Sequence, residues 1–100
     1  MIVLVDTSVW IDHLHRADQD LALLLERAEV LVHPMVIGEI ALGTIKHRAQ
    51  ILEALDDLPI AVVAADDEIL SFVELRALFG RGLNLVDTHL LASAILTPEA

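Results

Sequence analysis

The sequence predicts an α/β fold, in which three layers (α/β/α) are arranged around a central parallel sheet. Three short apolar runs, at 2–5, 30–32 and 60–63, alternate with segments whose apolar residues have helical spacing. Parallel strands need crossover connections, and helices supply them. The chain has 100 residues, 56% of them hydrophobic, which suits one domain with one core. We therefore expect a single domain over 1–100.

The first half of the chain opens with a strand. Residues 2–5 are continuously apolar, which is typical of a strand buried on both faces in a parallel sheet. Thr7 and Ser8 follow and favour the start of a short helix. Asp18 begins a second helix, and 30–32 forms a second strand. The apolar face predicted for the second helix consists of Leu21, Leu24, Leu25 and Ala28.

The middle of the chain contains two helices and a third strand. Pro34 occupies a position suited to the first turn of a helix over 35–44. A further helix is expected over 47–57. Pro59 ends that segment, and 60–63 then forms the third strand.

The last part of the chain is predicted to be helical. The acidic run 66–68 favours the start of a helix through the helix dipole, and this helix is expected to bury Phe79 before two glycines end it. The final helix spans about 85–96. Asn84 and Asp87 have the spacing of a capping box at its start.

The charge balance is strongly acidic, with 16 Asp and Glu against six Lys and Arg and a net charge of −10. This balance argues against a nucleic-acid binder that relies on Lys and Arg, unless metal ions neutralise some carboxylates. It also suits a basic partner. Lys46, His47 and Arg48 form the only compact basic segment, which we interpret first as a solvated helix start and second as a substrate-steering patch.

The composition also limits the site chemistry and the compartment. No cysteine occurs, so neither a disulfide nor a cysteine-based zinc site is available. The apolar run at the start is five residues long, which is too short for a signal sequence or a membrane span. We therefore expect a cytoplasmic protein.

Three acids stand alone in apolar sequence: Asp6, Glu39 and Asp87. Each is the only charged residue of its stretch, so burial is expected, and a buried carboxylate is costly unless it is paired or bound to metal. Asp6 also follows the first strand, at the edge where open α/β sheets place their sites. A hard cation such as Mg²⁺ would hold the three acids together. The stretches are 1–11, 34–45 and 82–98.

Each of these residues also has a purely structural interpretation. Asp6 can cap the following helix, Glu39 can pair with an arginine, and Asp87 can interact with a helix N-terminus. Thr7 and Ser8 act as helix caps more often than as ligands. The functional interpretation is preferred for the three acids because all three are isolated in the same way.

Three segments resemble motifs of PIN-domain nucleases, especially the VapC-type toxins of bacterial toxin–antitoxin pairs. Residues 5–12 (VDTSVWID) are similar to the first motif, residues 36–40 (VIGEI) to the second, and residues 85–94 (LVDTHLLASA) to the third. Their order and separation match across nearly the whole chain.

The resemblance implies a Mg²⁺-dependent endoribonuclease, with Mn²⁺ as a possible alternative ion. Asp6, Glu39 and Asp87 would be the catalytic residues and the metal ligands, and Thr7 and Ser8 would contact the substrate. Metal-activated water would cut the RNA in line, leaving a 5′-phosphate and a 3′-hydroxyl. The resemblance further implies a homodimer and a cognate antitoxin that blocks the active groove.

Two features depart from the family pattern. His33 and Pro34 stand where relatives commonly have Thr or Ser before the second-motif helix. Relatives also continue into a strand with a Thr-x-Asp pattern, which pairs with the first strand and adds a further acid. Without it, 2–5 becomes an apolar edge, and edges of this kind invite pairing with another chain. We therefore expect a PIN-like domain that lacks its C-terminal strand region.

Two other functions compete with the nuclease. A chain without the last strand can be a catalytically defective module that engages an antitoxin or another toxin copy. A phosphatase of the haloacid-dehalogenase type would use Asp6 as a nucleophile. It would need a second Asp two residues on, where this chain has Ser8, so we disfavour it.

Overall fold

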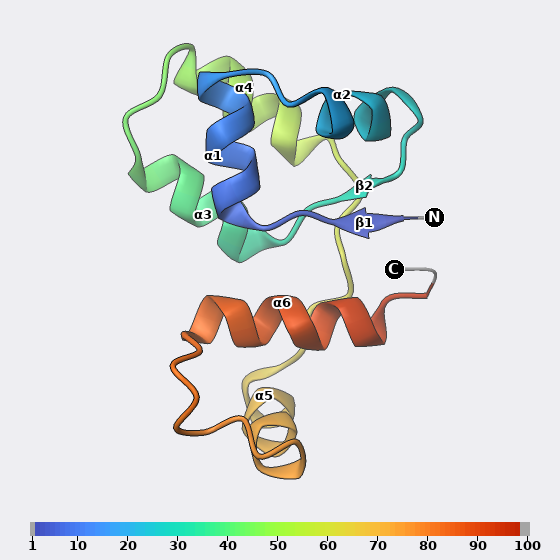
Figure 1. Cartoon of the computed structure of the whole chain (residues 1–100), viewed down its shortest axis with the longest axis vertical. Coiled ribbons are helices and arrows are strands. Elements are labelled where there is room, and N and C mark those ends of the chain that lie inside the picture. Colours follow the sequence, from blue (N-terminus) through green and yellow to red (C-terminus); the bar gives the residue numbers. More distant parts are fainter. Residues whose placement is uncertain (1, 99–100) are drawn as a thin grey trace.

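The computed structural model describes residues 2–98 as two short strands and six helices (Figure 1). Parallel pairing and the alternation of strands with helices agree with the predicted α/β class. In chain order the elements are β1 (Val3–Leu4), α1 (Thr7–His15), α2 (Gln19–Glu26), β2 (Val30–Leu31), α3 (Pro34–Leu42), α4 (Arg48–Asp56), α5 (Asp66–Leu75) and α6 (Leu85–Leu96).

The sheet is narrower than predicted. β1 and β2 pair in parallel, with Val3 opposite Val30 and Leu4 opposite Leu31. The third strand predicted at 60–63 is reduced to one parallel bridge between Val32 and Ile60.

The chain leaves the sheet after Ala61 because the partner segment turns into α3 at Pro34, which has no N–H to donate to a further bridge. The N–H of Ala61 still donates to Val32, at 3.0 Å. The N–H of Val62, however, donates to the hydroxyl of Thr97 at the end of α6, at 2.9 Å. The predicted strand at 60–63 was therefore wrong beyond its first residues.

The helices lie on both sides of this short sheet. Figure 1 shows α1, α2 and α4 on one side of the strands and α5 and α6 on the other. Within residues 2–98 the central layer is a two-stranded ribbon with one added bridge, so the full three-layer arrangement stays a prediction. β1 lies at its edge, as expected if no further strand pairs with it.

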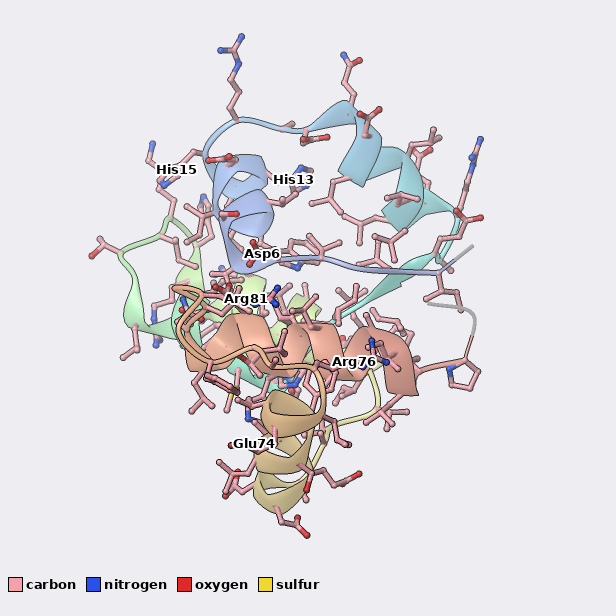
Figure 2. All side chains as sticks on the ribbon, turned by 60° about the horizontal axis from the view of Figure 1, so that its bottom comes forward. Asp6, His13, His15, Glu74, Arg76 and Arg81 are labelled. Carbon is pink, nitrogen blue, oxygen red and sulfur yellow. The ribbon has the colours of Figure 1, made fainter. Side chains whose placement is uncertain are left out.

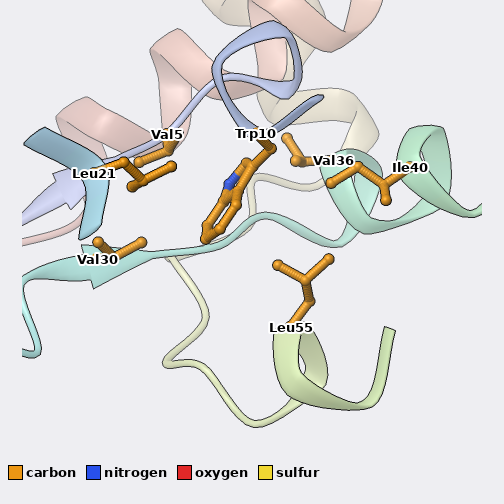
Figure 3. Close-up of a cluster of buried hydrophobic side chains, with 7 residues drawn as sticks. All are labelled: Val5, Trp10, Leu21, Val30, Val36, Ile40 and Leu55. Atoms are coloured by element: carbon orange, nitrogen blue, oxygen red, sulfur yellow. The ribbon is translucent and has the colours of Figure 1, made fainter. Parts of the chain in front are cut away.

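Most of the core lies on the α1–α4 side (Figure 3). The indole of Trp10 is 3% exposed and lies at its centre, and full burial of a large apolar side chain contributes about 1.5–3 kcal/mol. A smaller cluster of Ala64, Ile69 and Ala92, with Phe72 against it, joins α5 to α6. The main cluster consists of Val5, Trp10, Leu21, Val30, Val36, Ile40 and Leu55.

The helix starts agree well with the sequence. The carboxylate of Asp18 accepts the N–H of Leu21 at 3.0 Å and so caps α2. At α6 the side chain of Asn84 accepts the N–H of Asp87 at 2.7 Å, and the reciprocal bond is 3.4 Å long. Both caps were predicted.

Two helix ends were predicted too late. α2 ends at Glu26 and α5 at Leu75, and each is followed by an alanine with left-handed backbone, Ala28 (φ 54) and Ala77 (φ 49). The backbone bonds there form Schellman motifs: the residue after each alanine donates its N–H to a carbonyl five residues earlier, at 2.9 and 3.0 Å. Ala28 is therefore exposed rather than part of the α2 face, and Phe79 lies outside α5 and is 63% exposed.

None of the helices in the described range is both long and apolar enough to cross a membrane.

Candidate active site

Asp6 lies where β1 meets α1, at the position predicted from the sequence. It is the N-cap residue of α1, with extended backbone (φ −68°, ψ 153°), but its side chain makes no capping bond. Instead, the hydroxyl of Ser8 donates to Oδ2 of Asp6 at 3.2 Å. The capping interpretation of Asp6 is therefore not realised, and the exposed carboxylate retains oxygens that can bind a ligand.

Asp6 and Asp87 line the same open cavity, although 81 positions separate them in the chain. The cavity lies between the end of β1 and α6 and has a volume of about 330 Å³. Asp87 is half-buried in the first turn of α6 and belongs to its capping box, so its structural role is realised as well. The rest of the lining is apolar: Leu4, Leu83, Leu90, Leu91 and Ala94.

Glu39 is tied to the same region through Thr7. The hydroxyl of Thr7 donates to Oε1 of Glu39 at 2.6 Å, which joins the first turn of α1 to α3. Within residues 2–98 the hydrogen-bond partner of Glu39 is thus a threonine, not the arginine of the structural alternative. Thr7 is buried and stands next to Asp6, whereas Ser8 is exposed.

The predicted burial of the acids was wrong for Asp6 and Glu39, which are exposed, and Asp87 is half-buried. Their apolar neighbours face the core instead: Val36 and Ile40 are buried on the core face of α3, whereas Glu39 lies beside that face and is exposed. An exposed carboxylate has a small desolvation cost, so burial by itself does not require a metal here.

The donor chemistry suits a hard divalent cation. Asp6 and Asp87 present carboxylate oxygens to one cavity, and Mg²⁺ and Mn²⁺ prefer such ligands. Across residues 2–98, however, no three His, Cys, Asp or Glu side chains lie close enough to hold an ion together. Asp6 and Asp87 are the pair that would hold it. Glu39 as a third ligand stays a prediction.

A buried polar layer formed by the start of α3 and by α6 was not predicted. His33 and His89 are 1% and 4% exposed, and their rings meet edge to face with centroids 5.7 Å apart. Burial, and secondarily the neighbouring His89, lower the pKa of His33 below its ordinary value of 6.5. Ser93, one turn after His89 on α6, is also fully buried. The sequence carries no signal for this layer because the two elements are distant in the chain.

His33 also accounts for one departure from the family pattern. Its Nδ1 accepts the N–H of Met35 at 3.0 Å, so the imidazole caps α3. A Thr or Ser at this position would use its hydroxyl in the same way.

The protein-family model for the PIN domain matches residues 3–98 of the sequence. The chain belongs to the PIN-domain family. It is also 50% identical over 99 residues to Ribonuclease VapC32 of Mycobacterium tuberculosis, in both strain CDC 1551 / Oshkosh and strain H37Rv. The alignment covers 99% of this chain and 80% of those relatives. No solved structure matches the chain significantly.

The family match confirms the resemblance inferred from the three motifs. All three acids lie inside the matched range, in the segments that carried the resemblance. The PIN-domain match, together with Ser8 at the second-Asp position, also argues against the phosphatase alternative.

Proposed function

We propose that this PIN-domain protein is a divalent-metal-dependent endoribonuclease, the toxin of a type II toxin–antitoxin module. The observation that carries the proposal is that Asp6 and Asp87 meet at one open cavity, next to the bonded pair of Thr7 and Glu39. The relative that is 50% identical to this chain is named Ribonuclease VapC32, and this name supports the same activity here.

The side chains have separate tasks in this proposal. Asp6 and Asp87 hold a Mg²⁺ or Mn²⁺ ion, which when bound makes water more acidic and stabilises charge on phosphate oxygens. The Ser8 hydroxyl orients the carboxylate of Asp6. The Thr7 hydroxyl occupies Oε1 of Glu39, which leaves Oε2 to orient the attacking water and accept its proton. The products are a 5′-phosphate and a 3′-hydroxyl.

The partners follow from charge and exposed surface. A net charge of −10 suits an antitoxin with a basic segment that covers the acidic groove. Exposed apolar side chains of α5 and α6 favour a homodimer. We place these interactions in the cytoplasm.

Replacing Asp6 by Asn tests the activity. Asp6→Asn should lower the rate of RNA cleavage with Mg²⁺ by about 100-fold or more, because it removes a charged oxygen ligand. Since Asp6 is exposed, the far-ultraviolet circular dichroism should not change. Asp67→Asn, an exposed acid in the first turn of α5, is the matched control and should cleave normally. Equal rates for the two variants, or full activity in EDTA, would refute the metal-dependent nuclease.

The alternative is a binding module that engages an antitoxin or another toxin copy and cuts nothing. It is favoured by the observation that no three metal-ligating side chains converge within residues 2–98. Calorimetry with Mn²⁺ separates the two functions. Binding by the natural protein and none by Asp6→Asn supports the nuclease, whereas no binding by either favours the module.

A further inference from the structure

A second cavity lies at the opposite end of α1 from Asp6. Its volume is about 420 Å³, and His15, the last residue of α1, forms part of its wall. Figure 2 shows Asp6 and His15 at the two ends of this helix. The other lining residues are Leu14, Thr44, Ile45, Lys46 and Ile51, from α1, the α3–α4 connection and α4.

Basic residues cluster along the sequence at this cavity, in contrast to the rest of the chain. Lys46 and His15 line it, and Arg16 and Arg48 lie within two residues of them in sequence. Three of the chain's six Lys and Arg residues therefore line the cavity or lie within two residues of its lining, while the net charge of the whole chain is −10. No acid occurs between positions 40 and 52.

The basic group is partly fixed in place. Nε and Nη2 of Arg48 donate to the carbonyl of Ala41 at 3.1 and 2.8 Å, which ties the start of α4 to the last turn of α3. The closest acids to His15 along the chain, Asp12 and Asp18, are each three residues away and do not line the cavity. A cavity with Lys46 in its wall and no carboxylate among its lining residues is suited to an anion.

The cavity is connected to the acids by the contact between α1 and α3. At one end of this contact Thr7 bonds to Glu39, and at the other His15 lies against the segment that follows α3. His15 follows Thr7 by eight residues in α1, which is about 12 Å along the helix axis at a rise of 1.5 Å per residue. A stacked nucleic-acid strand rises 3.4 Å per nucleotide, so this distance spans roughly three to four nucleotides.

We infer that the cavity at Lys46 and His15 binds a backbone phosphate of the RNA, roughly three to four nucleotides from the bond that is cut. The inference rests on the proposed nuclease function, since that function places the scissile phosphate at Asp6 and Asp87. Lys46 is a positioning residue: it neutralises one phosphate and fixes the register of the strand, and it takes no part in the chemistry.

The salt dependence of RNA binding tests this site. Affinity for a labelled single-stranded RNA of about ten nucleotides is measured in EDTA at several NaCl concentrations. The logarithm of the binding constant falls linearly with the logarithm of the salt concentration. Loss of one phosphate contact makes this fall less steep, by about 0.7 in slope for a single strand. Lys46→Gln should show this change, with binding weakened several-fold at low salt, and Lys46→Arg should restore it. Arg27→Gln, at the end of α2 and outside the cavity, is the control with the same loss of charge.

Cleavage kinetics give a second readout. On the long RNA, Lys46→Gln and His15→Gln should raise KM and leave kcat unchanged, because the lost contact forms equally in the ground and transition states. On an RNA of two nucleotides, too short to reach the cavity, both variants should equal the natural protein. Both residues are exposed, so the fold should tolerate either change.

The outcomes separate the two proposals. If the natural protein cleaves RNA and Lys46→Gln matches Arg27→Gln in slope and KM, the phosphate site is wrong and the nuclease stands. If RNA is bound through Lys46 but never cut, the nuclease is wrong, and with it the spacing to a cut bond, while the contact of Lys46 with an RNA phosphate stands. Binding of a poly-glutamate peptide through Lys46, without RNA binding, would overturn the phosphate site in favour of an acidic protein partner.

Discussion

The hydrogen bond between Thr7 and Glu39 is the shortest link between the predicted site residues, at 2.6 Å. Thr7→Val keeps the shape of the side chain and removes the donor. We expect kcat for RNA cleavage to fall about tenfold, because Glu39 then loses the partner that orients it. Stability should fall by only about 1 kcal/mol, since the exposed Glu39 can bond to water instead.

Thr7→Ser provides the control for this prediction, because it keeps the hydroxyl. It should recover most of the activity in the same kinetic assay. If Thr7→Val cleaves at the natural rate, the bond is only a structural link between α1 and α3.

His33 predicts a pH-dependent stability. The pKa of its imidazole is lowered in the folded protein by burial and by His89, so the unfolded chain binds a proton more readily. The contribution of the neutral His33 side chain to folding stability is complete above the pKa of the unfolded chain, about 6.5. It is lost as the pH falls towards the lower pKa of the folded protein. The free energy of unfolding, measured in urea at several pH values, should therefore decrease below pH 6.5, by at most about 1.4 kcal/mol per pH unit from this residue.

His33→Asn removes the titrating group and keeps a side chain that can cap α3. Its unfolding free energy should depend less on pH over the same interval. His15→Gln, which removes an exposed histidine, controls for the change of residue type. The explanation fails if the free energy of unfolding of His33→Asn and that of the natural protein decrease equally as the pH falls below 6.5.

At the scale of elements, the two alanines that end α2 and α5 store conformational strain. Ala28 and Ala77 have φ values of 54° and 49°, and a left-handed backbone costs an L-residue about 1–2 kcal/mol. Glycine adopts this conformation without the clash, although it loses more backbone entropy on folding. Ala28→Gly and Ala77→Gly should each raise the free energy of unfolding by about 0.5–1 kcal/mol, as measured by urea denaturation.

The opposite result is expected inside a helix. Ala22 lies in the middle of α2, so Ala22→Gly should lower the free energy of unfolding by about 1 kcal/mol. A loss of stability in Ala28→Gly as well would mean that the left-handed residue is not strained.

At the scale of the whole molecule, α5 and α6 expose much apolar surface. Leu75 is 84% exposed and borders two adjoining cavities, one shared with Ile95 and Leu96 and one with Leu70. Contiguous apolar patches on soluble proteins commonly mark interfaces. Sedimentation velocity should detect a dimer at micromolar concentration, as the proposed homodimer requires, and Leu75→Lys should shift it to monomer.

A surface lysine introduced elsewhere controls for charge. Gln50→Lys on α4 is exposed and far along the chain from this patch, so it should leave the dimer unchanged. A natural protein that sediments as a monomer at all concentrations would contradict a homodimer built on this face.

The sequence by itself determined most of the helices and the family, and it predicted the candidate site residues. The α6 capping box was readable because Asn84 and Asp87 are local neighbours, and local spacing is what sequence patterns carry. Asp6, Glu39 and Asp87 were predicted as site residues because each stands alone among apolar residues. The ends of α2 and α5 were missed because alanine, not glycine, occupies the left-handed position.

Only the tertiary structure decided which groups meet and which face water. The cavity shared by Asp6 and Asp87, the bond from Thr7 to Glu39 and the contact of His33 with His89 all join residues distant in the chain. The exposure of Asp6 and Glu39 could not be inferred from apolar neighbours, because a helix or a strand end turns adjacent residues to different faces. The third strand was lost because its partner segment, 26 residues earlier in the chain, turns into α3 at Pro34, which has no N–H for a further bridge.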